Sequence, residues 1–463
     1  MMKRVIAIAL ALCMTLCLLS GCGGNPAASS GSAPGSASQS GAVSSEPTSS
    51  GGEEPSGEVV DYAASVKLDM SSSTAKEEVT VKLFVDGDTT HFYVPSSVSS
   101  TGVLKARYLA VNTPESTGKI EEYGKKASAF TKEKLSSATS IIIESEDGNW
   151  NADSTGDRYL SWIWYKTDDM EDYRNLNIEL LQNGLAIASN TAASRYGEAG
   201  TAAIEQAKAQ GLNIYSGQPD PDYYYGEAIE LTLKELRINI EEYEGMKVAF
   251  NGVVTNNSDN SVYVESFDPE TGLYYGMSVY YGYNLNGAGL EILTVGNEVR
   301  IVGSVQYYEA GGTYQVSDLN YRMMKPDDPG NIQKLSEGNT PAFVLTDTDT
   351  FFGEVELQME DSNITVDYAA MIMSTSVEMK NLKVLDVWTT TNEESASKGA
   401  MTLTCQADGN TISVRTAVLY DENGNLVTAD AYEGKTIDVR GIVDYYSGKY
   451  QIKVFSADQI TVH

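Results

Sequence analysis

The sequence predicts a mainly β protein built from small barrels, with its helices gathered in the first folded unit. Two observations carry this prediction for the C-terminal half. Between residues 227 and 324, Gly, Asn and Asp separate five strand-like runs, at 246–255, 261–267, 274–281, 298–307 and 313–319. Short strands with frequent turn residues are typical of a small Greek-key barrel, so we expect an OB-like domain at 227–325.

The second observation is an internal echo. Gly312-Thr-Tyr-Gln-Val316 returns as Gly448-Lys-Tyr-Gln-Ile452, and Glu244-Gly-Met-Lys247 before an apolar run is echoed by Glu433-Gly-Lys435. Self-similarity within a chain indicates repeated structural units. We therefore predict a second OB-like domain at 335–463, beyond a linker rich in Pro, Asp and Gly. The signals from 340 to 368 are weak, and their place in that domain stays open.

Residues 76–217 read as a first unit of mixed α and β structure. Strand-like apolar runs precede a helical pattern at 120–138. A later strand at 158–165 places Leu160, Trp162 and Trp164 on one face. A stretch of Gly, Pro and Asp at 217–222 then breaks regular structure and ends the unit.

The N-terminus has the pattern of an export signal. Lys3 and Arg4 precede an apolar run that is too short to span a membrane, and residues 1–21 read as a signal peptide. Leu19-Ser-Gly-Cys22 resembles the bacterial lipobox, in which the cysteine is acylated and becomes the mature N-terminus. We expect an exported bacterial protein anchored in the cell membrane by lipid on Cys22 and facing outside. A signal peptide cleaved nearby without lipidation is the alternative.

A tether follows the signal. Residues 23–58 are Ser, Gly, Ala and Pro with almost no apolar bulk, so burial cannot offset the entropy of ordering them. We assign 22–75 to a disordered linker, whose role is to hold the folded part away from the membrane. Two cysteines lie in the signal and Cys22 carries the lipid, which leaves Cys405 alone and predicts no intramolecular disulfide.

The residues that suggest chemistry lie in the first unit. The turn Asp86-Gly-Asp-Thr89 carries two carboxylates, and a later apolar run delivers Arg107 and Glu115. Asp88, Asn112 and Glu115 offer hard oxygen atoms of the type that holds calcium. Arg107 can brace a phosphate with a planar fork of donors.

Histidine content narrows the reaction class. The chain has only two histidines, His91 and His463, which argues against Ser-His-Asp catalysis and against a histidine-rich zinc site. An oxygen-bound metal with arginine and carboxylate remains, and this combination suits hydrolysis of a phosphodiester.

In its order of motifs, the first unit resembles the staphylococcal-type nuclease (thermonuclease-like) family. The resemblance implies a five-stranded OB-type barrel with three helices at 76–217. Five pieces carry it: the turn with the Arg107–Glu115 run, Tyr123-Gly-Lys-Lys-Ala-Ser-Ala-Phe-Thr-Lys132, Asp157-Arg158-Tyr-Leu-Ser-Trp-Ile163, Asn177-Ile-Glu-Leu-Leu-Gln-Asn-Gly-Leu-Ala186 and Ala207-Lys-Ala-Gln-Gly-Leu-Asn-Ile-Tyr-Ser216.

The resemblance also implies roles for individual residues. Asp88, Asn112 and the Thr113 carbonyl become calcium ligands, Glu115 the general base, and Arg107 and Arg158 the phosphate clamps. The family usually has aspartate where this chain has Asn112, and one charge fewer should weaken calcium binding. The second arginine normally follows Tyr-Gly. Here Arg158 follows Gly156-Asp157, and we expect the adjacent Asp157 carboxylate to neutralise part of the Arg158 charge.

Charge is unevenly distributed. The formal net charge is −32, which at first sight argues against a nucleic-acid partner. Residues 76–217 hold 14 Lys and Arg against 20 Asp and Glu, a net of −6, whereas 218–463 hold 15 against 38, a net of −23. No region has the basic stripe of a tight DNA binder. Tyrosines of the C-terminal barrels offer rings for base stacking, although core or ordinary strand surface is the more common role.

These observations predict a lipid-anchored, calcium-dependent nuclease that cleaves extracellular DNA or RNA, with two appended OB-like barrels of unknown ligand. The rival interpretation is a catalytically inactive surface lipoprotein that uses its barrels as binding modules. Asn112 is the feature on which the two differ most.

Overall fold

The computed structural model describes residues 59–463 except 259, 283–284, 286, 359–362 and 394. The predicted signal peptide, Cys22 and the tether up to residue 58 lie outside the described residues. Within the described part of the chain, no helix combines the length and the apolar character needed to cross a membrane. All of the described residues lie in one compact unit, Pro55–His463.

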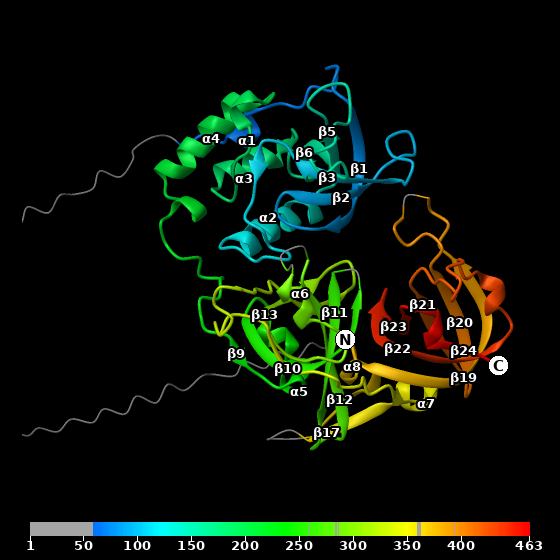
Figure 1. Ribbon diagram of the computed structural model, residues 1–463. Coiled ribbons are helices and arrows are strands. Elements are labelled where there is room, and N and C mark those ends of the chain that lie inside the picture. Colours follow the sequence, from blue (N-terminus) through cyan, green and yellow to red (C-terminus); the bar gives the residue numbers. More distant parts are fainter. Residues whose placement is uncertain (1–58, 259, 283–284, 286, 359–362, 394) are drawn as a thin grey trace, which may run out of the picture. The chain divides into compact units, whose positions relative to one another are not determined.

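The first barrel has five strands and is closed (Figure 1). Its strands pair in the order β3-β2-β1-β5-β6, and parallel pairing of β3 with β6 closes the ring. The strands are β1 (Lys76–Phe84), β2 (Thr89–Tyr93), β3 (Val103–Tyr108), β5 (Ser140–Glu144) and β6 (Tyr159–Lys166). Short strands β4 (Val111–Asn112) and β8 (Ile187–Ala188) pair with each other, and β7 (Arg174–Asn175) pairs with β6.

Two further closed barrels repeat this strand order. In every barrel the first strand pairs with the fourth, and the third pairs in parallel with the fifth. The prediction of three OB-like barrels in a mainly β chain is therefore confirmed. The second barrel comprises β10 (Lys247–Ser258), β11 (Ser261–Asp268), β12 (Leu273–Tyr280), β13 (Glu298–Tyr308) and β14 (Thr313–Ser317); the third comprises β19 (Ser376–Thr389), β20 (Met401–Ala407), β21 (Asn410–Thr416), β22 (Thr436–Tyr446) and β23 (Lys449–Val454).

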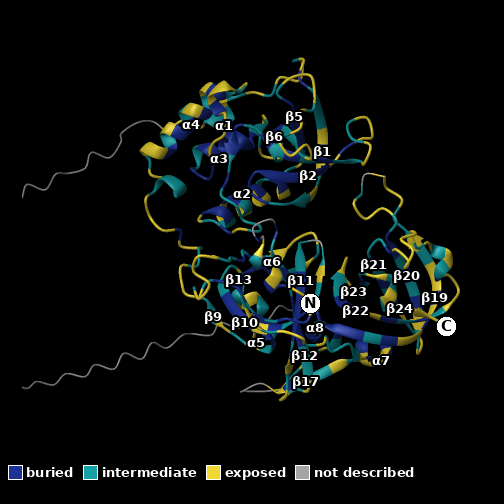
Figure 2. Ribbon diagram, in the orientation of Figure 1, coloured by how far each residue is buried: buried dark blue, intermediate teal, exposed yellow. Residues whose placement is uncertain are grey.

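Each barrel has its own core, because alternate side chains of a barrel strand point inward. In β3, Leu104, Ala106 and Tyr108 are buried while their neighbours are half exposed. Figure 2 shows buried positions in dark blue along the strands of the structure. In β6 residues 161–165 are all buried. Trp162 and Trp164 lie on the same face, as predicted, because both meet the ring of Tyr196 edge-on.

Three longer helices of the first unit match the prediction. They are α2 (Gly124–Ser136), α3 (Leu176–Gln182) and α4 (Gly197–Ala209). The helix α2 begins later than expected because Tyr123 adopts a left-handed conformation, with φ of 64°. The helix α3 is capped by the Asn175 side chain, which accepts a hydrogen bond from the backbone N–H of Ile178 at 3.0 Å.

The remaining elements are short. They comprise α1 (Tyr62–Ser65), η1 (Thr191–Ala193), η2 (Asn213–Tyr215), β9 (Ile229–Glu230), α5 (Leu233–Ile238), η3 (Ile240–Tyr243), α6 (Ala288–Ile292), β15 (Gln333–Ser336), β16 (Val344–Leu345), α7 (Thr348–Phe351), β17 (Glu354–Gln358), β18 (Asn363–Asp367), α8 (Tyr368–Met371), η4 (Ala429–Ala431), η5 (Ala457–Gln459) and β24 (Ile460–Val462).

Residues 59–75 are an ordered segment of the first unit, so the prediction that the disordered linker runs to residue 75 is wrong for these positions. Asp61 binds the Arg174 guanidinium through both carboxylate oxygens, at 2.6 and 3.0 Å. Ala63 is fully buried in the first core. Sequence composition missed this segment because its stability comes from partners more than 100 residues away, which local polarity does not reveal.

The boundary after residue 217 also shifts. The Asp220 side chain accepts a hydrogen bond from the backbone N–H of Tyr123 at 2.6 Å, directly before α2. Asp220 is 2% exposed although it lies in the stretch expected to be a linker. The first unit therefore extends beyond residue 217.

Two predictions about the C-terminal barrels need correction. The second barrel does not end at 325, because β15 pairs with β13. In addition, only one of the two sequence similarities between these barrels joins equivalent strands. The echo from Gly312 to Gly448 matches equivalent strands, β14 and β23. The echo from Glu244 to Glu433 instead joins the first strand of one barrel to the fourth strand of the next, since a glycine turn before an apolar run marks any strand start.

The stretch from 340 to 368, left open by the sequence, supports both C-terminal cores. Leu357 of β17 lies in the core of the second barrel, with Ile364 and Val366 of β18 packed against it. Phe351 of α7 lies in the core of the third barrel. The stretch therefore belongs to neither barrel alone.

Candidate active site

The site begins at the turn between β1 and β2. Asp86 accepts a hydrogen bond from the backbone N–H of Asp88 at 3.1 Å, which tightens the turn. Both carboxylates are buried, and Asp88 has no exposed surface. Gly87 permits the close approach of α2, because a Cβ there would lie 2.9 Å from the Ala127 Cβ. The Thr131 hydroxyl of α2 donates to the Gly87 carbonyl at 2.6 Å.

The ladder between β2 and β3 brings Arg107 to this turn. Thr89 pairs with Arg107, and the Tyr108 N–H donates to the Asp88 carbonyl at 2.8 Å. After β3 the chain turns back through Ala110, whose φ is 68°. The return places the Thr113 N–H 2.8 Å from Oδ2 of Asp88. Residues far apart in sequence thus meet at Asp88.

Arg107 lies at the centre of this group. Its NH1 donates to Oδ1 of Asp88, and its NH2 donates to Oδ1 of Asn112. The Arg107 side chain is 15% exposed. Three of the predicted metal-site residues, Asp88, Asn112 and Thr113, are therefore brought together, and a predicted phosphate clamp already contacts two of them.

Glu115 lies in the loop that precedes α2. Its N–H donates to Glu121 Oε2 at 3.2 Å, and the Glu121 N–H donates to the Glu115 carbonyl at 2.9 Å. Gly124 is required at the start of α2, since a Cβ there would lie 2.1 Å from the Glu115 carbonyl oxygen. The helix and the loop are therefore held at close backbone contact.

Arg158 is held by a residue that sequence reasoning missed. Its guanidinium binds Oδ2 of Asp153 at 2.7 Å, while the adjacent Asp157 pairs instead with Lys105. The expectation that Asp157 neutralises Arg158 is therefore wrong, because Asp153 pairs with Arg158 instead. The carboxylate comes from five positions upstream, through the fold of the 145–158 loop. The Arg158 side chain is 33% exposed and can reach a ligand from solvent.

Two carboxyl groups of the site hold protons more tightly than usual. Burial, and after it the charge of Asp86, raise the pKa of Asp88 to about 7, although Arg107 opposes the shift. Burial and then Asp86 also raise the pKa of Glu115, while Arg107 and Arg158 lower it. The positive charges of both Arg107 and Arg158 therefore act on the Glu115 carboxyl group, as expected for a base close to two phosphate-binding arginines. Asp86 is the second functional residue, after Asp153, that the sequence analysis did not assign to the site. Its position in the same turn as Asp88 could have indicated it.

The side-chain oxygen atoms at this site are of the chemical type that binds calcium. Asp88 and Asn112 point oxygen atoms at one guanidinium, so the pair already bounds a position that accepts positive charge. Hard oxygen donors of this type hold calcium. Among the described residues, no group of three or more His, Cys, Asp or Glu side chains is placed to bind a metal. A cation bound here would therefore need amide and backbone oxygens besides Asp88.

The comparison with protein families decides the nature of this unit. Residues 105–217 match the family described as staphylococcal nuclease homologue. The chain carries an SNase domain. The match begins inside β3, so the turn with Asp86 and Asp88 precedes it, and the β2–β3 ladder joins the turn to the matched part. A comparison with curated proteins gave no match.

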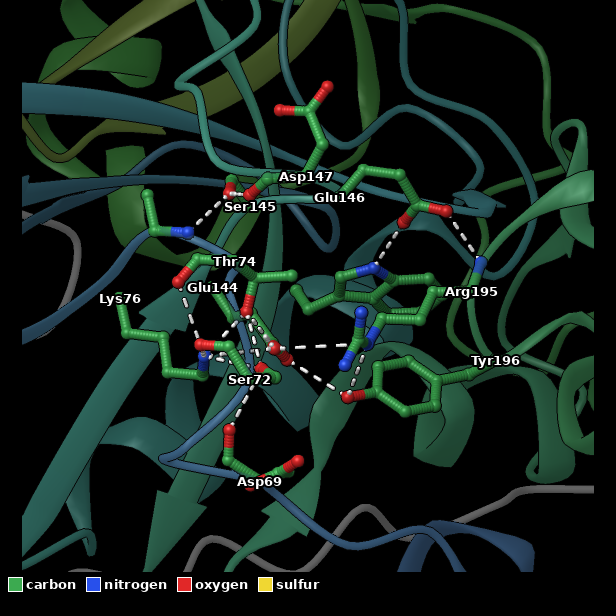
Figure 3. Close-up of polar contacts among 12 residues, drawn as sticks. Asp69, Ser72, Thr74, Lys76, Glu144, Ser145, Glu146, Asp147, Arg195 and Tyr196 are labelled. Carbon is green, nitrogen blue, oxygen red and sulfur yellow. Dashed lines mark hydrogen bonds and ion pairs between the residues drawn. The ribbon is translucent and has the colours of Figure 1, made fainter.

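A second polar cluster of the SNase domain surrounds Glu144, at the end of β5 (Figure 3). Glu144 is fully buried and accepts hydrogen bonds from three side chains, those of Thr74 at 2.6 Å, Trp164 at 2.9 Å and Tyr196 at 3.0 Å. Lys76 lies 3.7 Å from the same carboxylate. All of these groups are satisfied. The cluster therefore joins the 59–75 segment, β6 and the start of α4, at the base of the loop that carries Arg158.

Proposed function

We propose that this protein is a calcium-dependent phosphodiesterase, an endonuclease that hydrolyses DNA or RNA. One observation carries the proposal: within an SNase domain, Glu115 lies within electrostatic reach of both Arg107 and Arg158, and Arg107 contacts the side-chain oxygens of Asp88 and Asn112.

Each residue has a distinct role in this proposal. Glu115 takes a proton from the attacking water, and its raised pKa makes it a stronger base. Arg107 and Arg158 bind the phosphate and stabilise the charge that develops on it. Asp88, Asn112 and the Thr113 carbonyl would hold calcium, which supplies Lewis-acid polarisation of a phosphate oxygen when bound.

We further propose that the protein is exported and anchored by lipid on Cys22, and that it acts on nucleic acid outside the cell. The lipobox-like Leu19-Ser-Gly-Cys22 sequence supports this. A Ser/Gly-rich tether would give the SNase domain reach from the membrane.

The second candidate is a surface lipoprotein without catalysis. One observation favours it: Arg107 contacts Asp88 and Asn112 and so already neutralises the carboxylate that would hold the ion. In that case the barrels would serve as binding modules.

Release of acid-soluble nucleotides from DNA and RNA, with and without calcium, tests the proposal. We expect calcium-dependent release that Glu115→Gln reduces by at least about 100-fold, since general-base catalysis contributes about 10² to 10⁴ in rate. Glu205→Gln, a change at an exposed position of α4, is the matched control and should retain the rate. Absence of release by the unmodified chain with calcium present would favour the second candidate.

A further inference from the structure

Arg107 contacts the same two oxygen atoms that the proposed function assigns to calcium. Its NH1 meets Oδ1 of Asp88, and its NH2 meets Oδ1 of Asn112. The other oxygen of Asp88 is held by the Thr113 N–H at 2.8 Å. The Asp88 carboxylate is therefore fully occupied, and its charge is matched by one guanidinium.

Burial strengthens the electrostatic interaction between Arg107 and Asp88. Asp88 has no exposed surface and the Arg107 side chain is 15% exposed, so water screens their interaction poorly. A buried carboxylate without a positive partner is strongly unfavourable. Asn112 is neutral, so a single positive charge balances the pair of donors. A divalent ion added while Arg107 stays in place would meet an unscreened like charge.

We propose that Arg107 competes with the divalent cation for Asp88 and Asn112. Cation binding displaces the guanidinium, and the displaced guanidinium becomes free to bind the substrate phosphate. Arg107 is thus a positioning switch as well as a phosphate clamp. The inference rests on the proposed function and adds to it the order of events: the ion binds, Arg107 moves, and the phosphate gains its second arginine.

A thermodynamic consequence follows from linkage. If the ion releases Arg107 to the phosphate, then a phosphate ligand that holds Arg107 must tighten ion binding by the same factor. Arg158 provides the contrast, since it is paired with Asp153 and has no contact with Asp88 or Asn112. Only Arg107 should therefore couple the two ligands through the donor pair.

Calcium titration by calorimetry on the full mature chain tests this, with a nucleoside monophosphate as the phosphate probe. Arg107→Gln should bind calcium at least about fivefold more tightly than the unmodified chain, the low end of usual coupling between sites. Arg158→Gln, the matched control, should leave calcium affinity unchanged. The nucleoside monophosphate should tighten calcium binding less in Arg107→Gln than in Arg158→Gln.

Equal or weaker calcium binding by Arg107→Gln would overturn the inference, as would full coupling to the nucleoside monophosphate in that variant. Calcium binding by none of the proteins would overturn it as well. Nucleotide release measured on the same samples separates this failure from failure of the proposed function. Should Arg107→Gln fail to fold, Arg107→Lys, which keeps the charge but loses the fork that bridges two acceptors, should show a smaller gain in affinity.

Discussion

At the scale of single residues, the charge of Asp86 adds to the effect of burial on two neighbouring carboxyl groups. Asp86 is buried in the same turn as Asp88 and contributes to the raised pKa of both Asp88 and Glu115. An acid whose pKa is raised on folding stabilises the folded state at low pH. That contribution is lost as the pH rises through the folded pKa. For Asp88 this loss falls between pH 3.8, the ordinary pKa of an aspartate, and pH 7, because the folded protein raises that pKa to about 7.

We therefore expect Asp86→Asn to stabilise the protein at neutral pH relative to acidic pH. Asparagine keeps the oxygen that accepts the Asp88 N–H but removes the charge, so the pKa of Asp88 falls. Each unit of that fall is worth about 1.4 kcal/mol. Thermal unfolding of both proteins across pH 4 to 8, in buffer free of divalent ions, measures the difference in free energy of unfolding. A difference that does not grow with pH would contradict the assignment.

The motifs in the sequence predicted which residues would lie close to Asp88, but not the ion-pair partner of Arg158. The resemblance to the nuclease family implied that Asp88, Arg107, Asn112 and Thr113 act together. The β2–β3 ladder and the turn after β3 do bring them into contact. The partner of Arg158 was not predictable. Asp153 reaches it through an irregular loop, and nothing in the sequence distinguished Asp153 from the adjacent Asp157.

At the scale of elements, the Glu144 cluster holds the end of β5 against β6 and the 59–75 segment. Glu144→Gln would keep one acceptor but lose the charge that Lys76 and the indole N–H of Trp164 face. Hydrogen bonds to charged groups contribute about 1.5–3 kcal/mol each, so we expect a loss of about 2–4 kcal/mol in the free energy of unfolding. Urea unfolding followed by tryptophan fluorescence measures it.

Glu133→Gln is the control for that experiment, because the Glu133 side chain is 72% exposed on α2. It should leave the unfolding midpoint almost unchanged. An equal effect of both substitutions would show that the loss comes from overall charge and not from the buried cluster.

Strand positions in the second barrel were predictable to within about three residues, whereas the equivalence of strands between the two C-terminal barrels was not. Alternation and glycine turns are local signals, and they located β10 to β14 well. Which strand of one barrel corresponds to which strand of the other depends on pairing between distant segments. The echo between β14 and β23 succeeded because both follow a glycine with positive φ in a hairpin, Gly312 and Gly448.

At the scale of the whole molecule, most of the excess acidic residues lie in the sequence that follows the SNase domain. Residues 218–463 carry a net charge of −23 and residues 76–217 a net charge of −6. Such a field repels a polyanionic substrate over distances set by salt. The C-terminal barrels should therefore restrain association with nucleic acid while leaving the chemistry of the site in place.

A fragment of residues 59–226 should fold, because the first barrel has its own core and Asp220 completes it. We expect it to retain hydrolysis and to bind a single-stranded oligonucleotide more tightly than the full chain at low salt. The difference should shrink as salt rises, since the Debye length falls from about 10 Å at 0.1 M to about 3 Å at 1 M. Fluorescence anisotropy at both salt levels measures it; equal affinities at low salt would show that the acidic barrels exert no such field at the site.

The ordered 59–75 segment has a mechanical consequence for a protein held by its N-terminal end. Tension along the chain would first load the bidentate pair of Asp61 with Arg174 and the backbone contacts of Val60 with Gln206. Only after these gave way would the pull reach the Lys67–Asp172 pair, and then β1, the strand that leads into the turn with Asp86 and Asp88. In a chain anchored at Cys22, as proposed above, this segment would yield to a pulling force before that force distorted Asp88 and Arg107.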